Sequence, residues 1–348
     1  MRDKLDDPVL VTGGSGYLGG WVITTLLRRG YRVRTTLRGL ARADEVTRAI
    51  AREIGEAPDL EFVAADLLAD DGWSTAMAGA AYVIHTASPM PTGEYRGTDV
   101  IRPAREGTRR VLAAAQSAGV KRVVLTSSGL AAIDARAPRG PVEHIDGTMW
   151  TDLDAPGIND YTRAKTLAER DAWTFVADHS GPELATILPG FILGPALSAD
   201  LGSSMEVIAR MLRGKMPAIP RIGLSMVDVR DLAELHVLAM ERPAGAGQRL
   251  LASGGFRWLV ELAATLKQQL GPDADRVSTR RMPDLVLRAL ALVNDDVRQM
   301  VPNLGRQRHL DSNKARQLLG WETRPLETTL VDAAQSLLVQ RAPNHRQA

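Results

Sequence analysis

The chain has 348 residues, of which 45% are hydrophobic and 24% charged, so a disordered or collagen-like chain is excluded. It contains no cysteine, which excludes disulfides, thiolate metal sites and cysteine nucleophiles. The net charge of +2 comes from 43 basic and 41 acidic residues without a local basic cluster, so we expect no nucleic-acid partner.

The amino-terminal residues 1–7 are charged and lead directly into a strand-like run. They lack the apolar stretch of a secretory leader, and the apolar runs elsewhere are shorter than a membrane span. We therefore expect a cytoplasmic protein without a membrane partner. The polar residues 341–348 are expected to form a loose tail.

The first half of the chain alternates short β-branched runs with helical patterns. Strands are predicted at 9–11, 31–37, 60–65, 80–87, 120–126 and 184–192. Helices are predicted between them, one from Leu18 to a stop at Gly30 and another over 100–118. Strand, helix and strand repeated in this way predict an α/β fold with a doubly wound parallel sheet.

The pattern changes after Gly194 and Pro195. Residues 196–340 mix short helices with isolated strands such as 249–252, which predicts a smaller, mostly C-terminal α+β part. Methionines recur there, which fits either loose core packing or a flexible apolar substrate pocket. No low-complexity linker separates the two parts, so we expect them to share an interface.

A glycine-rich loop, Thr12–Gly19, joins the first predicted strand to the first helix. Such a loop turns sharply, lets the backbone approach a pyrophosphate and lets the helix pack close to the sheet. Free N–H groups at the positive end of the helix then bind the phosphates. The predicted cofactor contacts in this loop are Gly13, Ser15, Gly16, Tyr17, Leu18 and Gly19.

The end of the second predicted strand indicates which dinucleotide binds. Residues 35–38 contain no carboxylate to hold the ribose of NAD. Arg38 offers a fork of donors suited to a phosphate, so we predict NADP, with Arg42 as a second contact. A solvated surface arginine is the alternative. After the third strand, Asp66 and Leu67 fit contacts to adenine, although Asp66 fits the N-cap of a following helix equally well.

Tyr161 and Lys165 are four residues apart, so they share one face of a predicted helix. Thr126, Ser127 and Ser128 end the fifth predicted strand, at the carboxyl edge where open parallel sheets bind ligands. A buried tyrosine, a solvated lysine and a turn serine would be the plain structural interpretation of these three groups.

Together these motifs resemble the extended short-chain dehydrogenase/reductase superfamily. The branch they resemble holds the dihydroflavonol reductases, the cinnamoyl-CoA reductases and bacterial aldehyde/ketone reductases. The resemblance covers nearly the whole chain and rests on 12–19, 83–89, 107–108, 123–128, 161–165, 188–190, 194–195, 227–231 and 319–320. It implies a Rossmann-type NADP-binding domain at 1–195, rejoined by about 225–255, with 196–340 mostly binding substrate.

The catalytic residues that the resemblance implies are Ser128, Tyr161 and Lys165. Hydride transfer from nicotinamide to a carbonyl carbon leaves charge on the oxygen, which Tyr161 would protonate. A free phenol has a pKa near 10, and the ammonium of Lys165, together with the positive nicotinamide, would lower the pKa of Tyr161. Lys165 would also hold the nicotinamide ribose, and Ser128 would stabilise the carbonyl oxygen.

The resemblance implies further contacts around the nicotinamide and the substrate. Cofactor contacts are expected at Thr86, Ala87, Ser88, Pro189 and Ile192. Substrate contacts are expected at Ser88, Met90, Ile133, Gly190 and Met226. Ile133 stands where flavonoid reductases carry asparagine, which indicates an apolar pocket and a small apolar or aromatic carbonyl or alcohol substrate. Glu106 stands where many extended members carry asparagine, which puts an extended proton relay in doubt.

The leading hypothesis is a reversible NADP-dependent reductase of aldehydes or ketones. A nucleotide-sugar epimerase or dehydratase, a hydroxysteroid-type dehydrogenase and an NADP-sensing regulator without catalysis are the alternatives. His85 and His236 are expected to be structural, and no metal-ligand spacing occurs. The resemblance also implies a homodimer, which the residues alone do not decide.

Overall fold

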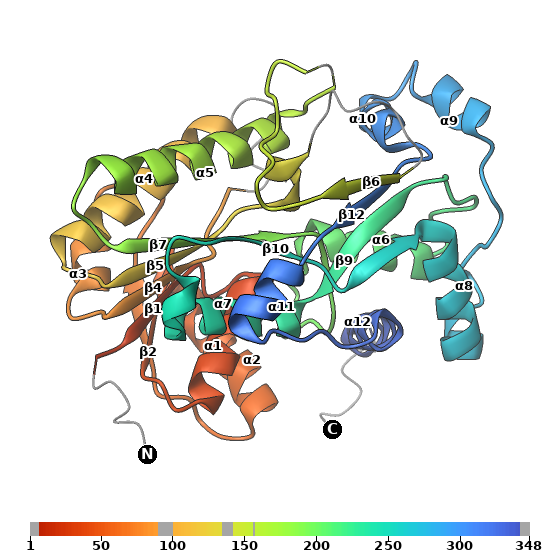
Figure 1. The fold of residues 1–348 in the computed structure, drawn as a ribbon. Coiled ribbons are helices and arrows are strands. Elements are labelled where there is room, and N and C mark those ends of the chain that lie inside the picture. The colour runs from red at the N-terminus through yellow and green to blue at the C-terminus, as the bar shows by residue number, and fades with distance from the viewer. Residues whose placement is uncertain (1–6, 90–99, 134–141, 156, 342–348) are drawn as a thin grey trace, which may run out of the picture.

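The computed structural model describes residues 7–89, 100–133, 142–155 and 157–341. Its larger sheet has seven parallel strands in the order β10, β7, β5, β4, β1, β2, β3 (Figure 1). The strands are β1 (Val9–Thr12), β2 (Val33–Leu37), β3 (Leu60–Ala64), β4 (Tyr82–His85), β5 (Arg122–Thr126), β7 (Glu183–Pro189) and β10 (Arg249–Ala252).

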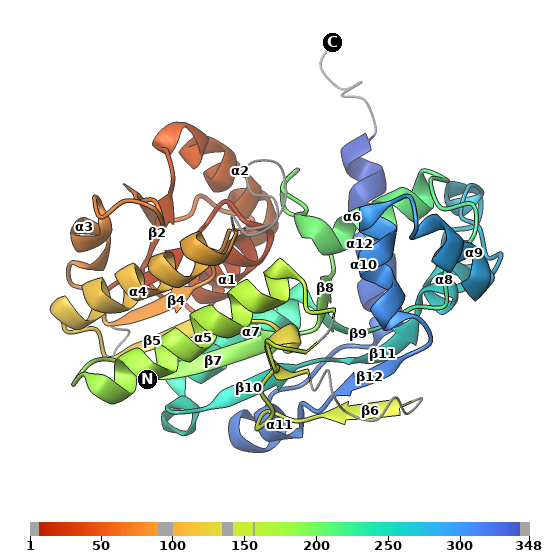
Figure 2. The ribbon, with the colours of Figure 1, turned by 90° about the horizontal axis from the view of Figure 1, so that it is seen from above.

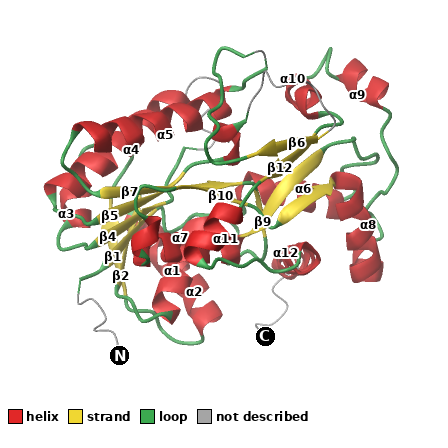
Figure 3. Cartoon of the chain, in the orientation of Figure 1, coloured by secondary structure: helices red, strands yellow, loops and turns green. Residues whose placement is uncertain are grey.

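Helices cover both faces of this sheet (Figures 1 and 3). One face carries α1 (Tyr17–Arg28), α2 (Ala43–Ile54), α7 (Val229–Glu241) and α11 (Asn313–Leu319). The other carries α3 (Trp73–Met77), α4 (Ile101–Ser117) and α5 (Asp160–Asp178). This arrangement confirms the predicted doubly wound, Rossmann-type α/β fold.

The central strands are apolar on both faces, as expected for a parallel sheet that helices cover on both sides. Val9, Leu10 and Val11 of β1 have no exposed surface. Because successive side chains of a strand point to opposite faces, Val9 and Val11 pack with α1 and α7, whereas Leu10 packs with α3 and α4. The sheet therefore separates two apolar cores.

A second part of the molecule lies beside the larger sheet (Figure 2). Its three-stranded sheet consists of β11 (Gly255–Trp258), β9 (Gly223–Asp228) and β8 (Phe191–Leu193), and a two-stranded sheet pairs β6 (Val142–Ile145) with β12 (Gln307–Leu310). Its helices are α6 (Gly202–Leu212), α8 (Leu259–Leu270), α9 (Asp284–Leu290), α10 (Asp295–Met300) and α12 (Leu326–Arg341).

Short 3-10 helices join several of these elements. They are η1 (Leu40–Arg42), η3 (Gly129–Ala132), η4 (Pro243–Gly245), η5 (Gly271–Ala274) and η6 (Val301–Asn303). A third apolar core fills the second part, between β8, β9, α6, α8 and α12. Within the described ranges, none of the helices is both long and apolar enough to cross a membrane.

Two strand predictions are wrong in detail. The predicted strand 184–192 is two strands, β7 in the larger sheet and β8 in the three-stranded sheet. Gly190 separates them where the chain passes so close to β9 that a Cβ there would lie 2.3 Å from the Ser225 carbonyl oxygen. Residues 249–252 are not an isolated strand, because they form β10 at the edge of the larger sheet.

The chain segment around 225–255 serves both sheets. Its first element, β9, pairs with β8 and β11 in the second part. The following α7 packs on the same face of the larger sheet as α1, and β10 then pairs with β7. Residues after 195 thus return to the larger sheet through α7 and β10.

Candidate active site

The loop between β1 and α1 packs so tightly against neighbouring backbone that only glycine fits at positions 13 and 19. Gly13 has a φ of +76°, and a Cβ there would lie 3.0 Å from the backbone of Ala87. A Cβ on Gly19 would lie 2.3 Å from the Gly13 carbonyl oxygen. The loop is also tied to β2, since the Gly14 N–H donates to the Thr36 carbonyl at 3.2 Å.

The N-terminus of α1 follows directly from this loop. Gly16 is the N-cap residue, no side chain caps this helix, and its first turn contains no acidic residue. Its first N–H groups therefore point outward as donors, together with the positive end of the helix dipole. The glycine cradle and this helix end fit a pyrophosphate, as the sequence predicts.

Arg38 and Arg42 follow β2 at the same edge of the sheet. Arg38 is exposed directly after the last residue of the strand. Arg42 is held by Glu45, with an N–O distance of 2.9 Å, and faces Asp200 of the second part at 3.5 Å. A phosphate bound here would therefore compete with two carboxylates for Arg42.

Asp66 and Leu67 lie in the turn after β3. The Asp66 carboxylate accepts a hydrogen bond from the backbone of Leu68 at 2.9 Å, and its carbonyl accepts one from the Trp73 indole. It does not cap a helix, because Gly72 is the N-cap residue of α3. Leu67 packs against Gly107 of α4 so closely that a Cβ on Gly107 would lie 2.8 Å away. The adenine contacts at Asp66 and Leu67 remain predictions.

The end of β4 is fastened to the glycine loop by Thr12. The Thr86 hydroxyl donates to the Thr12 carbonyl at 2.7 Å, and the Ala87 N–H donates to the Thr12 hydroxyl at 3.1 Å. The Thr12 hydroxyl also contacts Nδ1 of His85 at 2.7 Å. Residues 86–88 thus lie beside the loop, where the order of the strands reverses and open sheets bind ligands.

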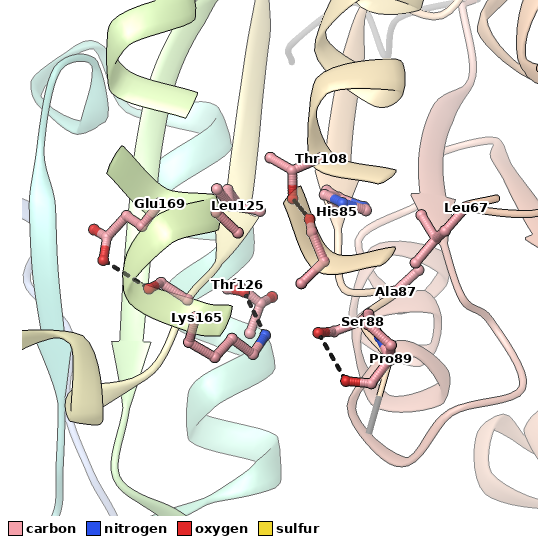
Figure 4. A pocket seen from close by; sticks show the side chains of 13 residues that line it. Leu67, His85, Ala87, Ser88, Pro89, Thr108, Leu125, Thr126, Lys165 and Glu169 are labelled. Atoms are coloured by element: carbon pink, nitrogen blue, oxygen red, sulfur yellow. Dashed lines mark hydrogen bonds between the residues drawn. The ribbon is translucent and has the colours of Figure 1, made fainter. Parts of the chain in front are cut away.

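Ser128, Tyr161 and Lys165, called here the Ser128 group, are brought together at the end of β5. The hydroxyls of Tyr161 and Ser128 are hydrogen-bonded to each other. One turn further along α5, the Lys165 ammonium donates to the carbonyl of Thr126 at 3.2 Å (Figure 4). Asn159 starts this helix by accepting a hydrogen bond from the Thr162 N–H, which places Tyr161 in its first turn.

Burial has the largest effect on the pKa values of Tyr161 and Lys165. Desolvation raises the pKa of Tyr161 to about 12, against the hydrogen bond with Ser128, which favours the phenolate. Desolvation lowers the pKa of Lys165 to about 8, against the attraction of Glu169. Among the groups of this chain, burial thus outweighs the lowering of the Tyr161 pKa that the sequence predicts. Tyr161 is protonated at neutral pH, as a proton donor must be.

A narrow cavity lies next to Lys165, between α4 and α5 at the ends of β4 and β5 (Figure 4). Its lining includes Lys165 and Ala87, whose N–H donates to the Thr12 hydroxyl beside the glycine loop. Its polar lining comes from His85, Ser88, Thr108, Thr126, Ser127, Lys165 and Glu169, and its apolar lining from Leu67, Ala87, Pro89, Ala104, Leu125 and Ala168.

The remaining predicted contacts lie at the border between the two parts. Pro189 is buried at the end of β7, and Ile192 is half-buried in β8. Ile133 is 7% exposed and Met226 1% exposed, since both pack in apolar cores. Met90 lies outside the described residues. The substrate contacts of this set, including Ser88 and Gly190, remain predictions.

The two histidines that are expected to be structural, His85 and His236, are buried and neutral. Desolvation lowers the pKa of His85 to about 3 and that of His236 to about 4. His236 contacts the Thr126 hydroxyl through Nε2 at 2.8 Å and the Leu232 carbonyl through Nδ1. Within the described residues, no three potential ligands gather in a way that could hold a metal ion.

Glu169 and Arg249, which the sequence did not predict as site residues, form a buried ion pair behind the Ser128 group. Glu169 lies four residues after Lys165 on α5, so helical spacing was a usable signal for it. Arg249 lies on β10, 80 positions after Glu169 in the sequence, and its pairing depends on the tertiary fold.

The chain is similar in sequence to a known protein family and to named reductases. Residues 9–251 match the model of the NAD dependent epimerase/dehydratase family. A cinnamoyl-CoA reductase of Oryza sativa subsp. japonica is 37% identical over 262 residues, which cover 75% of either chain.

Solved structures share the whole fold. Vestitone reductase from alfalfa has a TM-score of 0.74 at 26% identity, covering 96% of this chain and 99% of its own. The yeast methylglyoxal/isovaleraldehyde reductase in complex with NADPH has a TM-score of 0.77 at 23% identity, covering 96% and 98%. The second similarity supports the fold alone.

Proposed function

We propose that this chain, which belongs to the NAD dependent epimerase/dehydratase family, reversibly reduces an aldehyde or ketone to an alcohol with NADPH. Its relatives make it an NAD(P)-dependent reductase of the extended short-chain dehydrogenase/reductase type. The observation that carries the finer proposal is the hydrogen-bonded pair of Ser128 and Tyr161 beside Lys165, at the sheet edge that also holds the glycine loop.

The residues present fit NADPH. The glycine loop leaves no room for a side chain at Gly13, against the backbone of Ala87, or at Gly19, against the Gly13 carbonyl. Such close backbone packing suits a pyrophosphate held by backbone N–H groups. Arg38 and Arg42 would hold the 2′-phosphate, and Lys165 the nicotinamide ribose. When bound, the coenzyme supplies a hydride to the carbonyl carbon.

The residues of this chain provide the rest of the reaction. Ser128 and Tyr161 hold the carbonyl oxygen between their hydroxyls, and Tyr161 donates its proton as charge develops there. Lys165 keeps a positive charge near the phenol and stabilises the phenolate that remains. Its hydrogen bond to the Thr126 carbonyl fixes the side chain close to the end of β5.

The proposed substrate class rests on the substrate contacts expected at Ile133 and Met226, which pack in apolar cores. Ile133 and Met226 provide no polar group for a sugar or polyphenol rim. The relatives are named for the reduction of cinnamoyl-CoA and of vestitone, which supports a carbonyl group attached to an aromatic or apolar body. A dehydratase needs carboxylates after Ser128, and Gly129, Leu130 and Ala131 stand there instead.

The proposal is tested by following NADPH oxidation with a panel of aldehydes and ketones, for the wild type and Tyr161→Phe. Loss of the proton donor should lower kcat by about 10²- to 10⁴-fold while NADPH still binds. Tyr31→Phe is the matched control, because the Tyr31 hydroxyl donates to Glu241 on α7 instead. Wild-type turnover by Tyr161→Phe contradicts the mechanism, and NADPH binding without turnover across the panel favours a sensor.

A further inference from the structure

Three functional groups of α5 recur every four residues on one face. Lys165 and Glu169 lie one turn apart on this helix (Figure 4). Tyr161 precedes Lys165 by one turn. The Glu169 side chain is 0% exposed and pairs with Arg249 of β10 at an Nε–Oε1 distance of 2.8 Å. The proposed reaction assigns no role to either residue of this pair.

The Glu169 carboxylate connects α5 to three neighbouring strands. Its Oε2 accepts a hydrogen bond from the Ser127 hydroxyl, just beyond β5, at 2.7 Å. Its Oε1 accepts one from the Thr186 hydroxyl of β7 at 2.8 Å and one from Arg249 of β10. Ser127 lies between Ser128 and Thr126, whose carbonyl accepts from Lys165, so this carboxylate is attached at the centre of the reactive segment.

Arg249 connects the same carboxylate to the loops on the far side of Ser128. Its Nη2 donates to the carbonyl of Ala131 in η3 at 2.9 Å, and its Nη1 donates to the carbonyls of Gly147 and Met149. Its guanidinium also stacks on the Trp150 ring at 3.9 Å. Since η3 begins directly after Ser128, the pair holds the chain on both sides of this serine.

A second ion pair on the same strands shows what an ordinary structural pair looks like here. Arg122 of β5 pairs with Glu183 of β7 at 2.6 Å, at the amino ends of these strands. Arg122 also donates to the backbone carbonyls of Ala239, Met240 and Arg242, and these contacts include no residue of the Ser128 group. A buried ion pair contributes little stability over apolar residues of similar size, so stability alone does not account for the Glu169–Arg249 pair.

We propose that Glu169 is a positioning residue, held by Arg249, that fixes α5 against the end of β5 so that Tyr161 and Lys165 face Ser128. This inference rests on the proposed function for its effect on turnover, although the geometry can be measured without turnover. The positions of three reacting groups then depend on one carboxylate, and displacements of about 1 Å lower rates by about 10²-fold.

The charge of Glu169 has a second effect on Lys165. The charged and titratable groups near Lys165 are Tyr161 and Glu169 on the same helix and His85 on β4, and Arg249 lies behind Glu169. Tyr161 is neutral over the working pH range because burial raises its pKa to about 12. His85 is neutral above pH 4 because burial lowers its pKa to about 3. Glu169 thus supplies the negative charge that opposes the lowering of the Lys165 pKa by burial.

The first test compares Glu169→Gln, Glu169→Asp and the control Glu183→Gln by kcat, KM and pH profile. Glu169→Gln should lower kcat by about 10- to 100-fold with little change in the KM for NADPH. It should also shift the alkaline limb of the pH profile, where activity falls as Lys165 loses its proton, to lower pH. Glu169→Asp keeps the charge and should leave the limb in place. Wild-type kcat and an unchanged limb in Glu169→Gln would overturn the proposal.

A paired variant separates positioning from folding. Glu169→Gln alone leaves the buried Arg249 without its charged partner and can fail to fold. The double variant Glu169→Gln, Arg249→Met removes both charges and should regain a thermal midpoint near that of the wild type while kcat stays low. Recovery of kcat together with the thermal midpoint would mean that the pair has a structural role only, which overturns the proposal.

A measurement without turnover distinguishes this inference from the proposed function. The chain has six lysines, so carbon-13 labelling of lysine Cε gives a small set of NMR signals, and Lys165→Met assigns one of them. Glu169→Gln should lower the pKa of Lys165 below its value of about 8. An unchanged pKa overturns the inference, whereas failure of the wild type to reduce any carbonyl overturns the proposed function alone.

Discussion

At the scale of single residues, we propose that coenzyme choice depends on Arg38. Hydrogen bonds to charged groups contribute about 1.5–3 kcal/mol, so Arg38→Asp should weaken NADPH binding by about 10- to 100-fold. The introduced carboxylate should at the same time favour NADH by accepting from the ribose hydroxyls. Fluorescence titrations with both coenzymes measure the ratio of the two Kd values.

Arg32→Ala is the matched control for this substitution. Arg32 precedes β2 at the opposite end from Arg38 and pairs with Glu61. Its variant should keep the wild-type preference for NADPH. An unchanged preference in Arg38→Asp would show that Arg38 is a solvated surface residue.

The protonation of Lys165 sets a second prediction at the residue scale. Because burial lowers its pKa to about 8, Lys165 is charged below this value and neutral above it. Carbonyl reduction should therefore be constant from about pH 6 to 7 and fall as the pH rises through about 8. Lys165→Arg, whose charge persists to higher pH, should retain some activity without this alkaline limb. The same limb in both proteins would assign it to another group.

The sequence identified those site residues that lie close together along the chain. Tyr161, Lys165 and Gly13 to Gly19 could be found because one helix face and one loop bring them together. Arg249 could not be found, since its contacts with Ala131, Gly147 and Glu169 join segments far apart in the chain. The pKa direction of Tyr161 was also missed, because desolvation depends on the complete packing around the phenol.

At the scale of elements, the junction of β1, the glycine loop and α1 should tolerate no side chain. Gly19→Ala would place a methyl group 2.3 Å from a backbone oxygen, and backbone cannot move aside as a flexible side chain can. We expect NADPH affinity to fall more than about tenfold, which corresponds to a loss of about 1.4 kcal/mol of binding free energy.

Gly39→Ala is the control for the glycine loop. Gly39 follows β2 close to Arg38, and a Cβ there would meet no atom within 4 Å. Its variant should bind NADPH as the wild type does in the same titration. Equal affinity of Gly19→Ala and the wild type would contradict the role of this junction.

Elements with a strong local pattern were predicted well, including β1, α1, α4 and β5. The boundary at Gly190 was missed because both sides of it are apolar and extended, and the break depends on the approach of Ser225. The place of β10 was missed for a similar reason. Residues 249–252 look like any short strand, and only the fold pairs them with β7.

At the scale of the whole molecule, buried histidines should make the protein acid-sensitive. His236 is fully buried, and its pKa falls from 6.5 to about 4, whereas the unfolded chain binds the proton near pH 6.5. Its contribution of about 3 kcal/mol is therefore present above pH 6.5 and is lost as the pH falls towards 4.

Thermal unfolding between pH 7 and 4 tests this acid sensitivity. The midpoint should fall with pH, and His236→Gln should depend less on pH than the wild type. His179→Gln is the control, because His179 lies exposed at the end of α5. An identical pH dependence in His236→Gln and the wild type would contradict the assignment.

The central claim is that a hydride moves from NADPH to a carbonyl carbon at the Ser128, Tyr161 and Lys165 group. The most direct measurement uses NADPH deuterated at nicotinamide C4 on the transferred face, and locates deuterium in the product by mass spectrometry. The account predicts deuterium on the carbinol carbon with the wild type and almost none with Tyr161→Phe. NADPH oxidation without deuterium in the product, or equal transfer by both proteins, would contradict it.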